Sequence, residues 1–141
     1  MANNLSSTTK GNAMAILRSF CDLKVYQLSR AQAHQGFKLT QTFPRDERYS
    51  LTDQIRRSSR AVKSMIAEAW ADRRYPASFG SKMSDVLGET TETQSWLDDA
   101  LDFGYITVAQ HHEHDEIWQS LGGMINNTIE RADDFCRTAS K

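Results

Sequence analysis

The sequence predicts an all-α protein, an antiparallel up-down-up-down four-helix bundle, and three observations lead to this prediction. Apolar residues recur at alternating intervals of three and four over long stretches, which is the spacing of a helix face packed on other helices. The chain has only 7 glycines and 2 prolines, which favours long regular elements. Short links join the three longest stretches, and short links make consecutive helices antiparallel. The expected helices are approximately residues 22–39, 50–73, 76–103 and 107–137.

A proline separates the first two expected helices. Asp22 is expected to cap the first, because a carboxylate accepts hydrogen bonds from the free amides of a first turn. Pro44 ends this segment, since a proline disfavours the helical conformation in the residue before it. Ser50 and Asp53 have the spacing of a capping box and open the second helix. The expected core face of that helix is Leu51, Ile55, Ser58, Val62, Ile66 and Ala69.

The last two expected helices also have start and stop signals. Pro76 suits a first helical position, where its missing amide hydrogen costs nothing. Gly104 suits the left-handed residue that ends a helix. Thr107 and Gln110 form a second capping box. The expected inner face of the third helix is Phe79, Met83, Val86, Thr90, Thr93, Leu97, Ala100 and Leu101, and that of the fourth is Trp118, Leu121, Ile125, Thr128, Ala132 and Phe135.

Length and composition indicate one soluble domain. The 141 residues suffice to bury a hydrophobic core without disulfides or a structural metal. We expect a flexible N-terminal tail at 1–16 and a single bundle domain at 17–139. The net charge of −1 is not the strongly basic balance typical of nucleic-acid-binding domains. No apolar run is long enough to span a membrane and no secretory signal is evident, so we expect a cytoplasmic protein. Cys21 and Cys136 are interpreted as two reduced thiols, with a disulfide between the terminal helices as the alternative.

Opposite charges mark the second and third expected helices. The second carries four cations without an anion between them, and the third carries six acids against one lysine. Three interpretations stay open for the cations: ion pairing with carboxylates within or between subunits, contact with phosphates of nucleic acid, or a solvated face. The pairing hypothesis involves Arg57, Arg60, Glu89 and Glu92, because in an antiparallel pair these side chains can meet. The anion- or nucleic-acid-binding hypothesis involves Arg56, Arg57, Arg60 and Lys63.

No combination of residues points to catalysis, a metal or a cofactor. His111, His112 and His114 lie in the first turns of the fourth helix, where polar residues are normally solvated; a weak metal site is the alternative. The chain contains no H-E-x-x-H pattern, phosphate loop or nucleophile elbow. A di-metal bundle would need Glu-x-x-His motifs, and none occurs. We therefore expect a protein without enzymatic activity and without cofactors.

Several motifs resemble one known family. They are Phe20-x-x-Leu23, Gln54-x-Arg56-Arg57, Ile66-Ala67-Glu68, Glu89-x-x-Glu92 and Leu101-x-x-Gly104-Tyr105-Ile106. With these motifs the chain resembles the four-helix-bundle proteins encoded within intervening sequences of bacterial 23S rRNA genes, to which the accessory proteins of diversity-generating retroelements are related. The resemblance covers about residues 20–129. It implies an antiparallel bundle that assembles into a ring, commonly a homopentamer, and no known enzymatic activity.

Two functional hypotheses follow. The first is a self-assembling interaction scaffold whose main partner is the protein itself, with a pentamer favoured. Three tryptophans, more than one small core needs, and the opposite charges of neighbouring helices suggest the self-association. The second hypothesis is an accessory protein that binds RNA or DNA through the basic face of the second helix. The retroelement relatives implied by the resemblance are strongly basic, and this chain is not.

Overall fold

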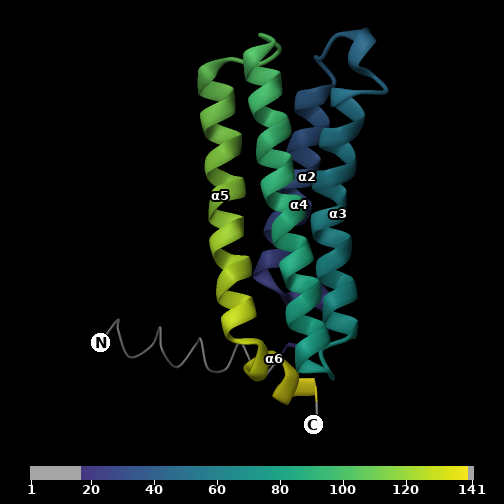
Figure 1. The fold of residues 1–141 in the computed structure, drawn as a ribbon, viewed down its shortest axis with the longest axis vertical. Helices are drawn as coiled ribbons and strands as arrows, with labels where there is room; N and C mark the ends of the chain where they lie inside the picture. The colour runs from purple at the N-terminus through teal and green to yellow at the C-terminus, as the bar shows by residue number, and fades with distance from the viewer. Residues whose placement is uncertain (1–16, 140–141) are drawn as a thin grey trace, which may run out of the picture.

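The computed structural model describes residues 17–139, which form four long antiparallel helices and three short ones (Figure 1). Each long helix packs on the next in the chain, and the fourth returns to contact the first, which closes the bundle. No strand occurs within residues 17–139, and the predicted fold class is confirmed. The elements are η1 Phe20–Asp22, α2 Lys24–Thr40, η2 Arg45–Glu47, α3 Leu51–Ala71, α4 Pro76–Asp102, α5 Val108–Glu130 and α6 Ala132–Ala139.

The core includes the helix faces that the periodicity predicts for α3 and α4. Every residue of the expected α3 face is buried, as is every residue of the α4 face except the half-buried Leu101. Trp118 of α5 is only 1% exposed and is the largest fully buried side chain. Because these positions recur every three to four residues, α3 and α4 each turn one mainly apolar stripe inward. The buried face of α2 is more polar and includes Ser29, Gln32 and Thr40.

A buried pair of hydroxyl groups links α3 to α4. The Thr93 hydroxyl lies 2.7 Å from the Ser58 hydroxyl and 2.9 Å from the carbonyl oxygen of Glu89. Both side chains are buried. A buried hydroxyl without a hydrogen bond is costly, so this pair favours one relative height of the two helices.

The helix ends confirm some of the predicted caps and correct others. Pro76 is the first residue of α4, Gly104 has a φ of 76°, and Thr107 forms its capping box. The Ser50 prediction was wrong, because its side chain caps nothing. The carboxylate of Glu47 instead accepts a hydrogen bond from the first amide of α3 at 3.3 Å.

Asp22 also differs from its predicted role. Its carboxylate accepts hydrogen bonds from the backbone amides of Arg18 and Ser19, at 3.0 and 3.1 Å. It therefore stabilises the short helix η1, and α2 begins one residue after Leu23, which supplies no side-chain cap.

The last expected helix is broken, which the periodicity did not predict. α5 ends at Glu130, and Arg131 adopts φ −102° and ψ 24° before α6 begins. In Figure 1 the short helix α6 folds across the end of the bundle. The bend lets Phe135 stack on Phe79 of α4 with ring centroids 5.9 Å apart. Burial of this aromatic pair compensates for the interrupted backbone hydrogen bonds.

The structure leaves part of the domain prediction untested. The expected tail at residues 1–16 lies outside the described residues. Within residues 17–139, none of the helices is both long and apolar enough to cross a lipid bilayer.

Candidate functional site

A groove between α3 and α4 brings together the four residues of the pairing hypothesis. Its volume is about 420 Å³. Ser58, one of the buried hydroxyl pair, forms part of its floor, while two arginines come from α3 and two glutamates from α4. The lining residues are Gln54, Arg57, Ser58, Arg60, Ala61, Ser64, Glu89 and Glu92. We call this the α3/α4 groove.

The charges in the α3/α4 groove face one another without close pairing. Among the residues that the structure describes, none of these arginines and glutamates forms an ion pair within 4.0 Å. Partial burial raises the pKa of Glu89, and Glu92 raises it further, whereas the charge of Arg57 opposes the shift. The arrangement is therefore two carboxylates that repel each other, with an arginine that compensates only in part. Pairing of these residues between subunits stays a prediction.

Replacing Glu89 by glutamine is expected to stabilise the fold at pH 7. Because the pKa of Glu89 is raised in the folded state, its negative charge destabilises that state wherever both states are ionised. The cost declines as the pH falls through the folded-state pKa, and it is absent below the ordinary carboxyl pKa of about 4.3. Urea titrations of E89Q and the parent at pH 7 and pH 3 measure this.

The same titrations need a carboxylate outside the groove as control. Asp85 is exposed within α4 and does not line the α3/α4 groove, so D85N should leave the free energy of unfolding nearly unchanged at both values of pH. A destabilised E89Q at pH 7 would mean that the carboxylate of Glu89 makes a favourable contact instead.

The basic stripe predicted on α3 is divided by the tertiary structure. Arg56 points toward α2, where its Nε donates to the Thr40 hydroxyl at 2.9 Å and its guanidinium lies 4.5 Å from the centre of the Phe37 ring. Arg57 and Arg60 are exposed beside the carboxylates of the α3/α4 groove, and Lys63 is half-buried. The four residues named in the nucleic-acid hypothesis thus do not share one environment, and Arg56 already serves the α2–α3 contact.

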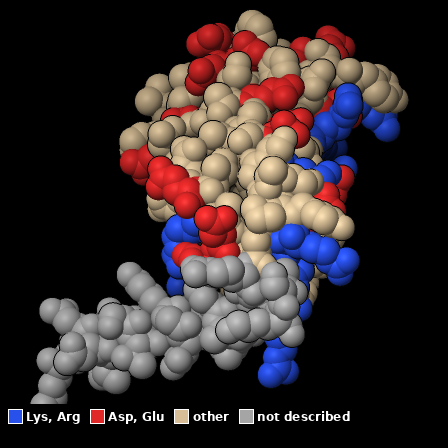
Figure 2. All heavy atoms as spheres, turned by 60° about the horizontal axis from the view of Figure 1, so that its bottom comes forward, with Lys and Arg blue, Asp and Glu red and all other residues tan. Residues whose placement is uncertain are grey.

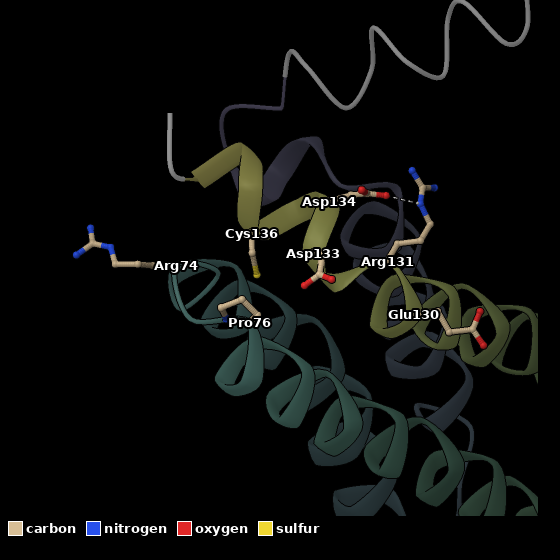
Figure 3. Close-up of a pocket in the computed structure, with 7 residues that line it drawn as sticks. All are labelled: Arg74, Pro76, Glu130, Arg131, Asp133, Asp134 and Cys136. Atoms are coloured by element: carbon tan, nitrogen blue, oxygen red, sulfur yellow. Dashed lines mark hydrogen bonds and ion pairs between the residues drawn. The ribbon is translucent and has the colours of Figure 1, made fainter.

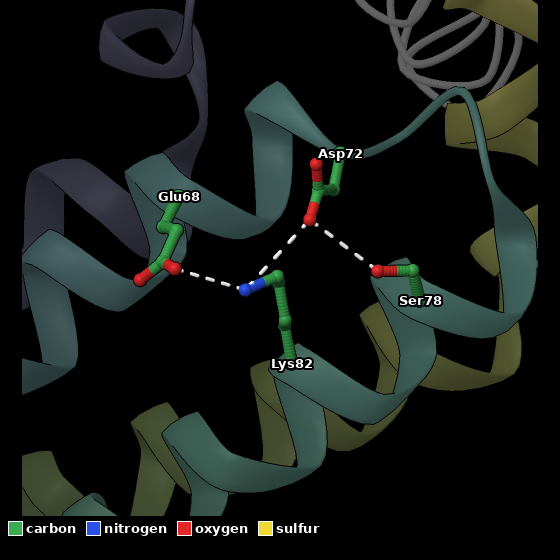
Figure 4. Close-up of polar contacts among 4 residues, drawn as sticks. All are labelled: Glu68, Asp72, Ser78 and Lys82. Atoms are coloured by element: carbon green, nitrogen blue, oxygen red, sulfur yellow. Dashed lines mark hydrogen bonds and ion pairs between the residues drawn. The ribbon is translucent and has the colours of Figure 1, made fainter.

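A second charged cluster joins α3 to the start of α4 (Figure 4). Lys82 donates to Glu68 at 2.9 Å and lies 3.7 Å from Asp72, which also accepts from Ser78. The glutamate hydrogen bond is the main cause of the raised pKa of Lys82. Lys82 contacts both carboxylates and so links the two helices. One ammonium against two carboxylates leaves the cluster with a net charge of −1.

A cleft of about 510 Å³ lies at the bend between α5 and α6 (Figure 3). In Figure 3 the Cys136 sulfur points toward Pro76, and Arg131 reaches Asp134 at 3.4 Å. Burial raises the pKa of the Cys136 thiol, and Asp133 raises it further. A thiol in that state is a poor nucleophile. Cys21 is exposed and no disulfide joins it to Cys136.

The histidines at the start of α5 contact three different partners. His111 lies 2.7 Å from Asp98, His112 lies 3.1 Å from Glu116, and His114 lies 3.2 Å from Gln32 of α2. Burial lowers the pKa of His114. Within residues 17–139, no three His, Cys, Asp or Glu side chains gather in a way that could hold a metal ion.

Charge is divided between the two halves of the bundle. α2 and α3 carry seven Lys and Arg and two Asp and Glu, whereas α4 and α5 carry one and ten. Figure 2 shows Lys and Arg mainly on the right of the view, the side of α3 in Figure 1, and Asp and Glu mainly on the left and at the top. The near-neutral net charge hides this separation. Three of the seven cations, Lys24, Arg30 and Lys38, lie on α2, and sequence analysis did not single them out.

Comparisons with known proteins agree with this architecture. A crystal structure of a protein of unknown function from the S23 ribosomal protein family of Bacteroides thetaiotaomicron superposes with a TM-score of 0.68. It is 23% identical and covers 75% of this chain and 95% of its own, so it supports the fold alone. No curated protein matches the chain. The sequence model of the 23S rRNA-intervening sequence proteins matches residues 21–127, and the chain therefore belongs to the 23S rRNA-intervening sequence protein family.

Proposed function

We propose that this protein is a non-enzymatic scaffold that assembles with copies of itself, five in the favoured form. The observation that carries the proposal is the division of charge between the α2/α3 half and the α4/α5 half of one bundle. Faces of opposite sign on one molecule favour contacts in which different surfaces of two copies meet. Such heterologous contacts form closed rings when the rotation between copies closes. The number five comes from the family resemblance.

The tryptophans contribute less to the proposal than the charges do. Trp70 and Trp118 are buried in the core of the chain itself, and Trp96 is half-buried against it. They therefore serve intramolecular packing and leave the charge division as the main support for assembly.

Light scattering at micromolar concentration tests the proposal. The expected mass at low salt is about five times the 16.0 kDa of one chain. The assembly should weaken as salt rises, because the screening length shrinks from about 10 Å at 0.1 M to about 3 Å at 1 M. A mass of one chain at both salt concentrations would contradict self-assembly.

Nucleic-acid binding through α3 is the alternative, and the surroundings of its cations favour it less. Arg56 contacts α2, while Glu89 and Glu92 lie beside Arg57 and Arg60 and would repel phosphates. A filter-binding titration with structured RNA at two salt concentrations separates the alternatives. Affinity that falls steeply with salt and is lost in R57E/R60E, with the fold intact by circular dichroism, would support the alternative.

A further inference from the structure

The outer face of α4 carries a stripe of small side chains. These residues recur at intervals of four, four, three and four, so they lie in one line along the helix. Gly80 is half-exposed and the others are exposed. Asp98 continues the same line toward the end of the helix. The stripe consists of Gly80, Ser84, Gly88, Thr91 and Ser95, and we call it the α4 small-residue stripe.

No contact within residues 17–139 explains its glycines. None has a positive φ, and a Cβ atom built at Gly80 or Gly88 would meet nothing within 4 Å. Gly123 on the neighbouring helix α5 is equally open. Each glycine inside a helix costs about 0.5–1 kcal/mol relative to alanine. A close approach by another molecule would explain why the helices lack side chains here.

The open glycines of α4 and α5 lie at similar heights along the bundle, and because they lack side chains the surface is shallow there. A Cβ atom at Gly122 would lie 3.6 Å from Leu87 of α4. Gly88 follows Leu87 and Gly123 follows Gly122 in the chain, so the bare positions of the two helices lie at similar heights. A helix placed along this surface can come closer than it could over larger side chains.

The outer face of α2 matches this surface in shape and charge. Its exposed residues recur at intervals of three, four, three and four, with a small residue at the centre and no acid: Lys24, Gln27, Ala31, His34 and Lys38. α2 and α4 run in the same direction, because each is antiparallel to α3, which lies between them in the chain. Asp98 gives one end of the α4 line a negative charge, whereas Lys24 and Lys38 make the outer face of α2 positive.

Contacts with α3 give the relative heights of the two outer faces. Arg56 of α3 contacts Thr40 of α2, and Ser58, half a turn further along α3, contacts Thr93 of α4. At about 1.5 Å per residue, Lys38 therefore lies nearly one and a half turns below Asp98, and Ala31 lies about half a turn below Gly88. Copies related by a rotation axis parallel to the bundle are not displaced along it, so residues of equal height meet.

We propose that the α4 small-residue stripe is the docking surface for the α2 helix of a second copy of this chain. Ala31 of one copy packs over Gly88 of the next, and Lys38 of the first reaches Asp98 of the second. The inference rests on the proposed self-assembly and specifies its interface. The two surfaces lie on different helices, so each copy can receive one neighbour and dock on another.

Gly88→Leu tests the docking surface. The isolated fold should be retained, since the site is open and leucine favours a helix more than glycine does. Sedimentation velocity should show association weakened at least tenfold, because the new side chain separates the two helices. Ala71→Leu, at an exposed position at the end of α3, is the matched control and should assemble like the parent.

The results distinguish this interface from the wider proposal. Assembly of both variants like the parent would overturn the α4 docking surface and leave self-assembly standing. A parent chain that is monomeric would overturn both proposals. Loss of assembly in Gly88→Leu alone, with a melting temperature in the dissociated state at least as high as that of the parent, supports the interface.

Exchanging the charges of Lys38 and Asp98 tests whether α2 is the helix that docks on the α4 small-residue stripe. Lys38→Glu and Asp98→Lys should each weaken association, and the double variant should restore it through a reversed pair between copies. Asp98→Lys also removes the contact of Asp98 with His111 of its own copy, at 2.7 Å, so the restored association of the double variant is the decisive result. If the single variants assemble normally while Gly88→Leu does not, α2 is not the helix that docks there.

Discussion

Trp118→Ala is expected to lower the free energy of unfolding by about 3–5 kcal/mol, the range for truncation of a large aromatic residue in a core. The indole is 1% exposed and belongs to the central cluster with Leu121 and Ile125 of the same helix. Its removal leaves a cavity that rigid helices on all sides can fill only in part. Urea denaturation followed by circular dichroism measures the loss.

Trp96→Ala provides the matched control for Trp118→Ala. Trp96 is half-buried, and its Nε1 is shielded from solvent without a hydrogen-bond partner in the structure. Its truncation removes less buried surface and also removes an unpaired donor, so it should cost clearly less. Equal losses for the two variants would contradict the assignment of Trp118 to the centre of the core.

Thr93→Val is expected to cost about 1–3 kcal/mol, because it leaves the Ser58 hydroxyl buried without its partner across the helix interface. The two hydroxyl oxygens are 2.7 Å apart, and both residues are at most 4% exposed. Valine has nearly the shape of threonine, so the cost reports the lost hydrogen bond and not a cavity. Thermal and urea unfolding of T93V give the value.

The double variant S58A/T93V completes a thermodynamic cycle. In T93V the Ser58 hydroxyl keeps only a long hydrogen bond to the carbonyl oxygen of Ile55, at 3.5 Å. Removing both hydroxyls eliminates this poorly satisfied group, so the double variant should be more stable than T93V alone. Additive losses would show that the two hydroxyls act independently and that their contact does not set the relative height of α3 and α4.

The long helices could be predicted closely from the sequence, and some of their ends could not. Every residue that apolar spacing assigned to the buried face of α3 is buried, although Thr52, Ser59 and Trp70 are buried too. Pro76 and Gly104 marked the ends of α4. The end of α5 at Glu130 has no glycine or proline to signal it. It depends on Phe135 reaching Phe79 of a different helix, and such a contact between distant segments leaves no local pattern.

The candidate site was predictable in part. The opposite charges of the second and third helices were evident, and the structure places Arg57, Arg60, Glu89 and Glu92 around one groove. Their ion pairing is not formed within one chain, and their pairing between chains awaits measurement. The small residues around Gly88 had a visible spacing of three and four, yet small residues signal a surface only when the exposed side of the helix is known.

The sequence by itself determined which faces of α3 and α4 are buried, because a helix repeats every 3.6 residues and its apolar stripe is a local property. Only the tertiary structure decided which helices become neighbours and at what heights. Those relations place Arg56 against Thr40 and Phe37 and divide the charge between two halves of the bundle. They also bring Gly88 and Ala31 to similar heights on opposite outer faces. They depend on side-chain packing between residues far apart in the chain, which no periodicity within one helix encodes.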